Sequence, residues 1–92
     1  MIVEQTSYFA KAMKKLRANQ QNCVEAAVRD IMANPMIGEM KKGDLAGMRV
    51  YKFPMLKQLT LLAYSYAEKR LTLRLLALGS HENFYRDLKN IH

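Results

Sequence analysis

The chain has 92 residues, which allows one small domain spanning residues 1–92 and excludes a multidomain protein. Half of the residues are hydrophobic, which excludes a disordered chain, and the formal net charge of +7 favours a polyanionic partner: nucleic acid, an acidic protein or a membrane surface. The single cysteine, Cys23, excludes an internal disulfide. There is no basic signal-peptide start and no run of roughly 20 apolar residues, so we expect a cytoplasmic protein.

The first half of the chain has the pattern of a short strand followed by two amphipathic helices. Residues 2–4 suit the strand, and either Thr6 or Ser7 can cap the first helix with a side-chain oxygen. Asn22 begins a sequence that resembles a capping box and predicts the start of the second helix, which should end before Pro35. The apolar stripes of the two helices predict a helical hairpin that packs on a common partner.

In the second half the hydrophobic period changes to two, which is typical of strands. Three strands are predicted, at residues 48–53, 58–66 and 70–78, and Pro54 should end the first of them. Short loops between these strands predict two antiparallel hairpins. The predicted fold class is therefore α+β, with an N-terminal helical hairpin packed on an antiparallel sheet and a short C-terminal helix.

The loop lengths suggest a register for these strands. If Phe53 pairs with Gln58 and a three-residue loop follows Tyr66, Arg49 and Arg74 lie on either side of a leucine. One face of the sheet would be apolar and covered by the helices, and it would hold Val50, Leu59, Leu61, Ala63, Leu71, Leu73, Leu75 and Ala77. The other face would be basic and aromatic, and it would hold Arg49, Tyr51, Phe53, Thr60, Leu62, Tyr64, Thr72 and Arg74.

A basic and aromatic sheet face suits single-stranded RNA, because arginines meet phosphates while rings stack on bases. An ordinary solvated face with amphipathic tyrosines explains the same pattern and stays open as the alternative. The Gly-containing loop before the sheet adds adjacent lysines but lacks the Gly-x4-Gly-Lys-Ser/Thr spacing of a P-loop. The candidate RNA contacts are Lys41, Lys42, Lys52, Arg74 and Arg86.

One histidine, His81, follows the point where the last apolar stretch ends. Ser80 can cap a short helix, which would place His81 and Tyr85 on one side of it and the apolar anchors Phe84 and Leu88 on another. A histidine exchanges protons near neutral pH, as RNA cleavage by attack of a 2′-OH requires. A histidine that only begins a helix remains the alternative. No spacing resembles a metal site or a dinucleotide fingerprint, so we expect no metal or cofactor.

These features together resemble the RelE/ParE superfamily of toxins from type II toxin–antitoxin systems, over nearly the whole chain. The segments that carry the resemblance are KKGDLAGMRVYKF, QLTLLAYSY and, most specifically, LALGSHENFYRDLK. The resemblance implies a small α+β fold and a cognate antitoxin that wraps and neutralises the toxin. RelE-like members cut mRNA in the ribosomal A site without a metal, whereas ParE-like members poison DNA gyrase. A non-catalytic, partner-binding member of the fold is a third possibility.

The resemblance also implies roles for individual residues. RelE-type toxins place a catalytic basic residue, and YafQ-type toxins a histidine, just after the glycine that closes the last strand, and His81 matches this position. Tyr85 matches an aromatic residue a few positions later, and Arg49 matches a basic residue on the first strand of the hairpin. Many members carry an arginine at the start of the next strand, where this chain has Thr60. The implied catalytic residues of an mRNA endoribonuclease are thus His81, Tyr85 and Arg49.

Overall fold

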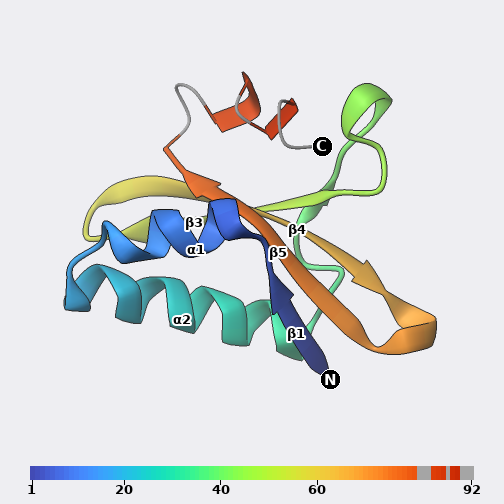
Figure 1. Cartoon of the computed structure of the whole chain (residues 1–92), viewed down its shortest axis with the longest axis horizontal. Helices are drawn as coiled ribbons and strands as arrows, with labels where there is room; N and C mark the ends of the chain where they lie inside the picture. Colours follow the sequence, from blue (N-terminus) through green and yellow to red (C-terminus); the bar gives the residue numbers. More distant parts are fainter. Residues whose placement is uncertain (81–83, 87, 90–92) are drawn as a thin grey trace.

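The computed structural model describes residues 1–80, 84–86 and 88–89. Two helices pack on one side of a five-stranded sheet, which confirms the α+β prediction, and residues 84–86 and 88–89 lie on the other side (Figure 1). No helix in this described part is long and apolar enough to cross a membrane. In chain order the elements are β1 (Ile2–Gln5), α1 (Ser7–Lys14), α2 (Ala18–Ala33), β2 (Glu39–Met40), the 3-10 turn η1 (Gly43–Leu45), β3 (Arg49–Met55), β4 (Gln58–Ala67), the 3-10 turn η2 (Glu68–Arg70) and β5 (Thr72–Gly79).

The strands are arranged in the order β1-β5-β4-β3-β2, so that β1 and β2 form the two edges. The predicted short first strand is confirmed and runs parallel to β5, whereas the other pairs are antiparallel. The prediction that Pro54 ends β3 is wrong, because the strand continues to Met55. Beyond Val50 this side of β3 no longer pairs with β2, and a proline is tolerated at such an open edge.

Local hydrogen bonds define where the helices begin and end. Thr6 caps α1, as predicted: its hydroxyl accepts from the Phe9 N–H at 3.1 Å and donates to the Leu76 carbonyl at 2.7 Å, which ties the helix to β5. The predicted start of α2 at Asn22 is wrong, because the helix begins earlier, where the Gln20 side chain accepts from the Arg17 N–H at 2.8 Å. The end of this helix before Pro35 is confirmed.

Both faces of the sheet are covered, and each carries a buried cluster. On the helix face, under α1 and α2, the buried residues are Phe9, Val24, Ala27, Ile31, Phe53, Met55, Leu62, Tyr64, Leu73, Leu75 and Leu78. On the opposite face, which we call the C-terminal face, they are Leu45, Met48, Val50, Leu61, Ala63, Ala77, Phe84 and Leu88. The prediction of one apolar face under the helices and one wet face is therefore wrong: the face with Phe53 and Tyr64 lies under the helices.

The β4–β5 pair differs from the predicted register because its turn is longer than predicted, and it also contains a β-bulge. Ala63 pairs with Ala77, but the next residue, Tyr64, pairs with Leu75, so that Leu76 has no partner of its own. The remaining residues of β5 are shifted by one position and thus exchange faces. At the other end of the pair the turn spans residues 68–71, one residue more than predicted, and Ala67 pairs with Thr72. Arg74 therefore lies opposite Ser65, whereas the predicted register placed it opposite Leu62.

Tyr64 holds the segment between α2 and β2 against the sheet. Its side chain is fully buried, and its hydroxyl donates to the Pro35 carbonyl at 2.7 Å and accepts from the Gly38 N–H at 2.9 Å. Arg49 adds a bond from Nη1 to the Gly38 carbonyl at 2.8 Å. A Cβ atom at Gly38 would lie only 2.8 Å from the Tyr64 ring, so the approach requires glycine. Burial raises the pKa of Tyr64, which keeps its hydroxyl able to donate.

We predict that Tyr64→Phe lowers the free energy of unfolding by about 1–3 kcal/mol, because the buried Gly38 N–H and Pro35 carbonyl each lose a partner. Chemical denaturation monitored by circular dichroism measures this loss. Tyr51→Phe is the matched control, since the Tyr51 hydroxyl bonds Asp30 at an exposed position and its removal should change stability by no more than about 0.5 kcal/mol. Equal stabilities of the Tyr64→Phe variant and the wild type would contradict the assignment.

Candidate functional site

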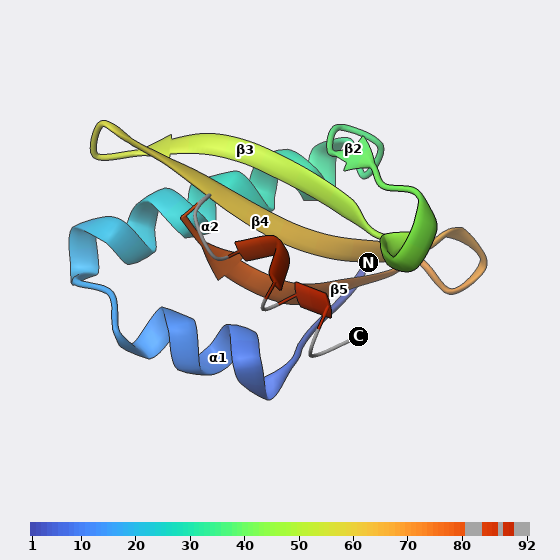
Figure 2. The ribbon, with the colours of Figure 1, turned by 90° about the horizontal axis from the view of Figure 1, so that it is seen from above.

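The C-terminal face brings together several of the residues that the sequence predicted for RNA contact. Lys52 lies two residues after Val50 on β3 and so shares this face with it. Tyr85 follows Phe84 in the C-terminal segment, by which we mean residues 84–86 and 88–89, and this segment lies over the sheet in Figure 2. Lys41 follows β2, and its backbone N–H donates to the Met48 carbonyl at 2.9 Å, which extends the pairing of β2 with the region before β3.

Lys41 is held between a carboxylate and an aromatic ring. Its Nζ lies 3.0 Å from Glu39 Oε1 and 5.2 Å from the centroid of the Tyr85 ring, within the range of a cation–π interaction. The hydrogen bond with Glu39, followed by the interaction with Tyr85, raises the pKa of Lys41 against the opposing effect of burial. Lys41 is therefore a fixed cation at neutral pH, suited to binding a phosphate and not to exchanging protons.

Glu39 belongs to this group although the sequence analysis did not single it out. Its pKa is lowered by the hydrogen bond and the charge of Lys41 and, to a smaller extent, by the charge of Lys52. The signal that could have found it is the spacing of Glu39 and Lys41 by two residues, which places both side chains on one side of a strand. Within the described residues, no three His, Cys, Asp or Glu side chains form a potential metal site.

Phe84 and Leu88 anchor the C-terminal segment, as predicted. Both side chains are buried, and Phe84 Cδ1 would lie 3.6 Å from a Cβ atom at Gly79, so the segment packs close to the end of β5. The Phe84 and Tyr85 rings meet edge to face with centroids 5.3 Å apart. His81, the predicted proton-transfer residue, lies outside the described residues, directly after Ser80 in the chain.

Arg74 also lies on the C-terminal face, but in a separate groove. The groove has a volume of about 330 Å³, and its lining residues are Thr6, Ala46, Gly47, Met48, Ser65, Arg74, Leu76 and Leu88. The exposed Arg74 guanidinium offers a third cation on the face that carries Lys41 and Lys52. Lys42 and Arg86 are exposed as well.

Arg49 and Thr60 lie on the helix face, away from Tyr85. Arg49 pairs with Tyr64 across the β3–β4 ladder, and its Nη1 donates to the carbonyls of Met36 at 3.3 Å and Gly38 at 2.8 Å. The structure thus does not bring Arg49 together with Tyr85, the other predicted catalytic residue that it describes. Thr60 is only 3 % exposed, and its hydroxyl donates to the Gln58 carbonyl. An arginine at this position would project toward the helices, so Thr60 removes no charge from the C-terminal face.

Comparison with protein families identifies the class of protein. A family model described as a ParE-like toxin of type II bacterial toxin–antitoxin systems matches residues 3–89. The chain therefore belongs to this family of toxins, as the resemblance to the RelE/ParE superfamily predicted. Comparison with curated proteins gives no match.

Solved structures of such toxins share the fold. The intact E. coli RelBE toxin–antitoxin complex matches with 15% identity over 88% of this chain and 96% of the other, at a TM-score of 0.70. The Mycobacterium tuberculosis RelBE2 toxin–antitoxin complex matches with 21% identity over 87% and 96%, at a TM-score of 0.74. A YoeB/ParE toxin from Agrobacterium tumefaciens matches with 17% identity over 88% and 99%, at a TM-score of 0.71. At these identities the likeness shows the fold alone.

We predict that Glu39→Gln lowers the pKa of Lys41, because the variant removes the carboxylate whose hydrogen bond and charge stabilise the ammonium group. Titration of the lysine 13Cε resonances by NMR measures the shift. The resonance of Lys57, on the exposed turn between β3 and β4, serves as an internal control in the same spectra. An unchanged Lys41 titration would contradict the observed pairing.

Proposed function

We propose that this toxin is a metal-independent, ribosome-dependent mRNA endoribonuclease that cleaves by attack of the 2′-OH on the adjacent phosphate. The observation that carries the proposal is the placement of Lys41 and Tyr85, with Lys52 nearby, on the face where the C-terminal segment packs against the end of β5. His81 follows that strand end by two residues in the chain. A proton-transfer residue, an aromatic ring and fixed cations are the groups that this reaction needs.

Each residue has a defined task in the proposed reaction. His81 acts as the acid or the base: the base takes the proton of the 2′-OH, and the acid gives a proton to the leaving 5′ oxygen as its bond to phosphorus breaks. The products are a 2′,3′-cyclic phosphate and a 5′-OH. Lys41 and Lys52 stabilise the negative charge that accumulates at phosphorus. Tyr85 positions the phosphate or a base, and the phenol ring fixes the direction of the Lys41 ammonium group.

Arg49 is better explained as a positioning residue than as a catalytic one. Its guanidinium and the Tyr64 hydroxyl both bind the backbone of Gly38, the residue immediately before β2. Since β2 leads directly into Lys41, these bonds determine where the ammonium group lies. Lys52, Arg74 and the exposed Lys42 and Arg86 would contact flanking phosphates of the RNA, in keeping with the net charge of +7.

A second candidate function is inhibition of DNA gyrase by binding. The match to a ParE-like family model favours it, because the ParE-like branch of the superfamily poisons gyrase. A non-catalytic, partner-binding member of the fold is the third candidate. His81 would be dispensable in both alternatives, so replacement of this residue separates them from the nuclease.

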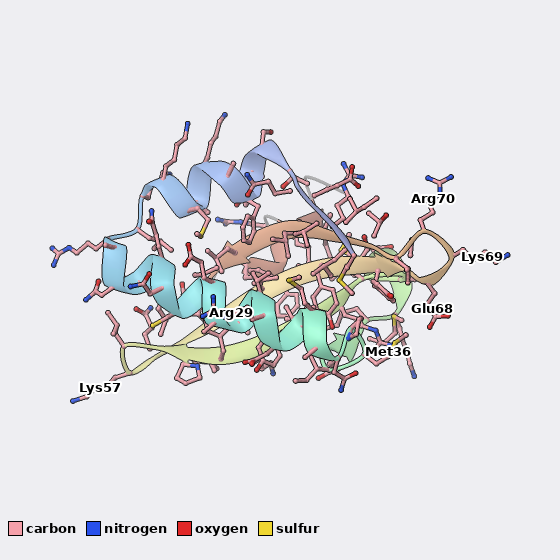
Figure 3. The ribbon with its side chains drawn as sticks, turned by 90° about the horizontal axis from the view of Figure 1, so that it is seen from below. Arg29, Met36, Lys57, Glu68, Lys69 and Arg70 are labelled. Atoms are coloured by element: carbon pink, nitrogen blue, oxygen red, sulfur yellow. The ribbon has the colours of Figure 1, made fainter. Side chains whose placement is uncertain are left out.

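We predict that His81→Ala reduces mRNA cleavage by about 100-fold or more, the range that a lost general acid or base produces. Wild type and variant are induced in cells, and new 5′ ends are mapped on ribosome-associated mRNA. The toxicity of the variant should fall together with the cleavage. Lys57→Ala is the control for a change of one exposed residue, because Lys57 lies on the turn between β3 and β4 (Figure 3).

Two results would contradict the nuclease assignment. Equal toxicity of wild type and His81→Ala, with no new mRNA ends in either, would favour the gyrase target, and a supercoiling assay with purified toxin would then test it. Cleavage that is unchanged in the His81→Ala variant would instead show that another residue transfers the proton.

A further inference from the structure

Four large apolar side chains are exposed close together in the chain: one near the end of α2, two in the segment that leads to β2 and one in β2 itself. Their exposed fractions are 39 % for Met32, 46 % for Met36, 42 % for Ile37 and 48 % for Met40. We call this set the methionine patch. Two of them, Met36 and Met40, line the same hollow, and exposed apolar side chains gathered on a small protein usually mark an interaction site. Methionine is also the residue that adapts best to a partner of irregular shape.

A hollow of about 500 Å³ adjoins the methionine patch. It is larger than the groove beside Arg74, and its lining residues are Met36, Met40, Gly47, Arg49, Tyr66, Ala67, Glu68, Lys69 and Arg70. Figure 3 shows Met36 at the same end of the molecule as the turn that carries Glu68, Lys69 and Arg70. The hollow thus combines methionine and tyrosine side chains with a rim on which two exposed cations outnumber one carboxylate.

The side chains of the hollow lie mainly on the helix side of the sheet, whereas Lys41 and Tyr85 lie on the other side; Gly47 lines both the hollow and the groove beside Arg74. Arg49 and Tyr66 belong to the helix face, since they pair with Tyr64 and with Leu73 of its buried cluster. Lys41 and Tyr85 belong to the C-terminal face. A partner in the hollow would therefore leave the Lys41–Tyr85 group uncovered.

We propose that the hollow and the methionine patch together bind an acidic, amphipathic segment of the antitoxin. The apolar side of such a segment would pack on the methionines and Tyr66, while its carboxylates would meet Lys69 and Arg70. A second copy of this chain fits less well, because each copy carries a net charge of +7 and brings the same basic rim. RNA fits less well too, because apolar methionines offer its phosphates no hydrogen bonds. The proposal rests on membership of the toxin–antitoxin family and not on the nuclease activity.

The apolar half of the surface is tested with Met36→Lys and Met40→Lys. The probe is the antitoxin encoded in the adjacent reading frame, titrated as the full-length protein by isothermal calorimetry. An added lysine should attract an acidic partner, so a loss of affinity can be ascribed to lost apolar contact. Each variant is expected to bind at least tenfold more weakly. Leu56→Lys is the matched control, because Leu56 is 54 % exposed on the β3–β4 turn. This variant should bind the antitoxin with the same affinity as the wild type.

The charged half of the surface is tested with Arg70→Glu. We expect affinity to fall about tenfold or more at low salt and to depend less on salt concentration than that of the wild type, because attractive charge pairs are replaced by repulsion. Lys57→Glu is the control, since it makes the same change of charge at an exposed position outside the lining of the hollow (Figure 3).

Toxicity without antitoxin distinguishes this site from the target-binding site. The variants at Met36, Met40 and Arg70 should inhibit growth as strongly as the wild type when no antitoxin is present. Three results would overturn the proposal. The first is that all three variants bind the antitoxin with wild-type affinity, and the second is that the variants are no longer toxic when no antitoxin is present. The third is that the variants lose self-association while they still bind the antitoxin as the wild type does. The second would assign the hollow to the cellular target, and the third to another copy of the chain.

Discussion

The hydrogen bonds that Tyr64 and Arg49 make with the backbone of residues 35–38 hold the short edge strand β2 in place on the sheet. β2 has only two residues, Glu39 and Met40, and such a short edge strand gains little from pairing alone. The Tyr64 hydroxyl and the Arg49 guanidinium bind the backbone immediately before it, and Gly38 allows the close approach. The position of Lys41, just beyond β2, depends on these bonds together with its own backbone bond to the Met48 carbonyl.

Burial on both faces of the sheet is the second constraint, and it requires the bulge at Ala63 and Tyr64. If the pairing of Ala63 with Ala77 continued without the bulge, Leu75 and Arg74 would exchange faces. Arg74 would then lie under the helices, where the described core holds no carboxylate to pair with it. With the bulge, Leu73 and Leu75 fill the helix face, while Arg74 reaches the surface beside Ser65. One extra residue in β5 thereby moves a charge from the core to the C-terminal face.

Sequence patterns predicted the elements well and the faces poorly, for physical reasons. Alternation and capping are local, so the three hairpin strands, the cap at Thr6 and the helix end before Pro35 follow from neighbouring residues. The burial of Tyr64 is not local: its hydroxyl is satisfied by backbone 26 and 29 residues away, and a tyrosine with such partners looks like a surface residue in the sequence. The bulge leaves no mark in the hydrophobic pattern. Because the face that carries Tyr64 was expected to be the wet one, Arg49 was expected beside the RNA, and it lies beside Gly38 instead.

β2 also connects the two surfaces that the proposals assign to different partners. Met40 pairs with Arg49 and lines the hollow on the helix side, whereas Glu39 pairs with Val50 and, like Lys41, lies on the C-terminal face. A slip of one residue in this pairing would turn the methionine toward the RNA site and the charges toward the antitoxin hollow. The register of a two-residue strand thus decides which surface is apolar and which is basic. That register is fixed by the same Gly38 contacts that position Lys41, so both proposed sites depend on one set of buried hydrogen bonds.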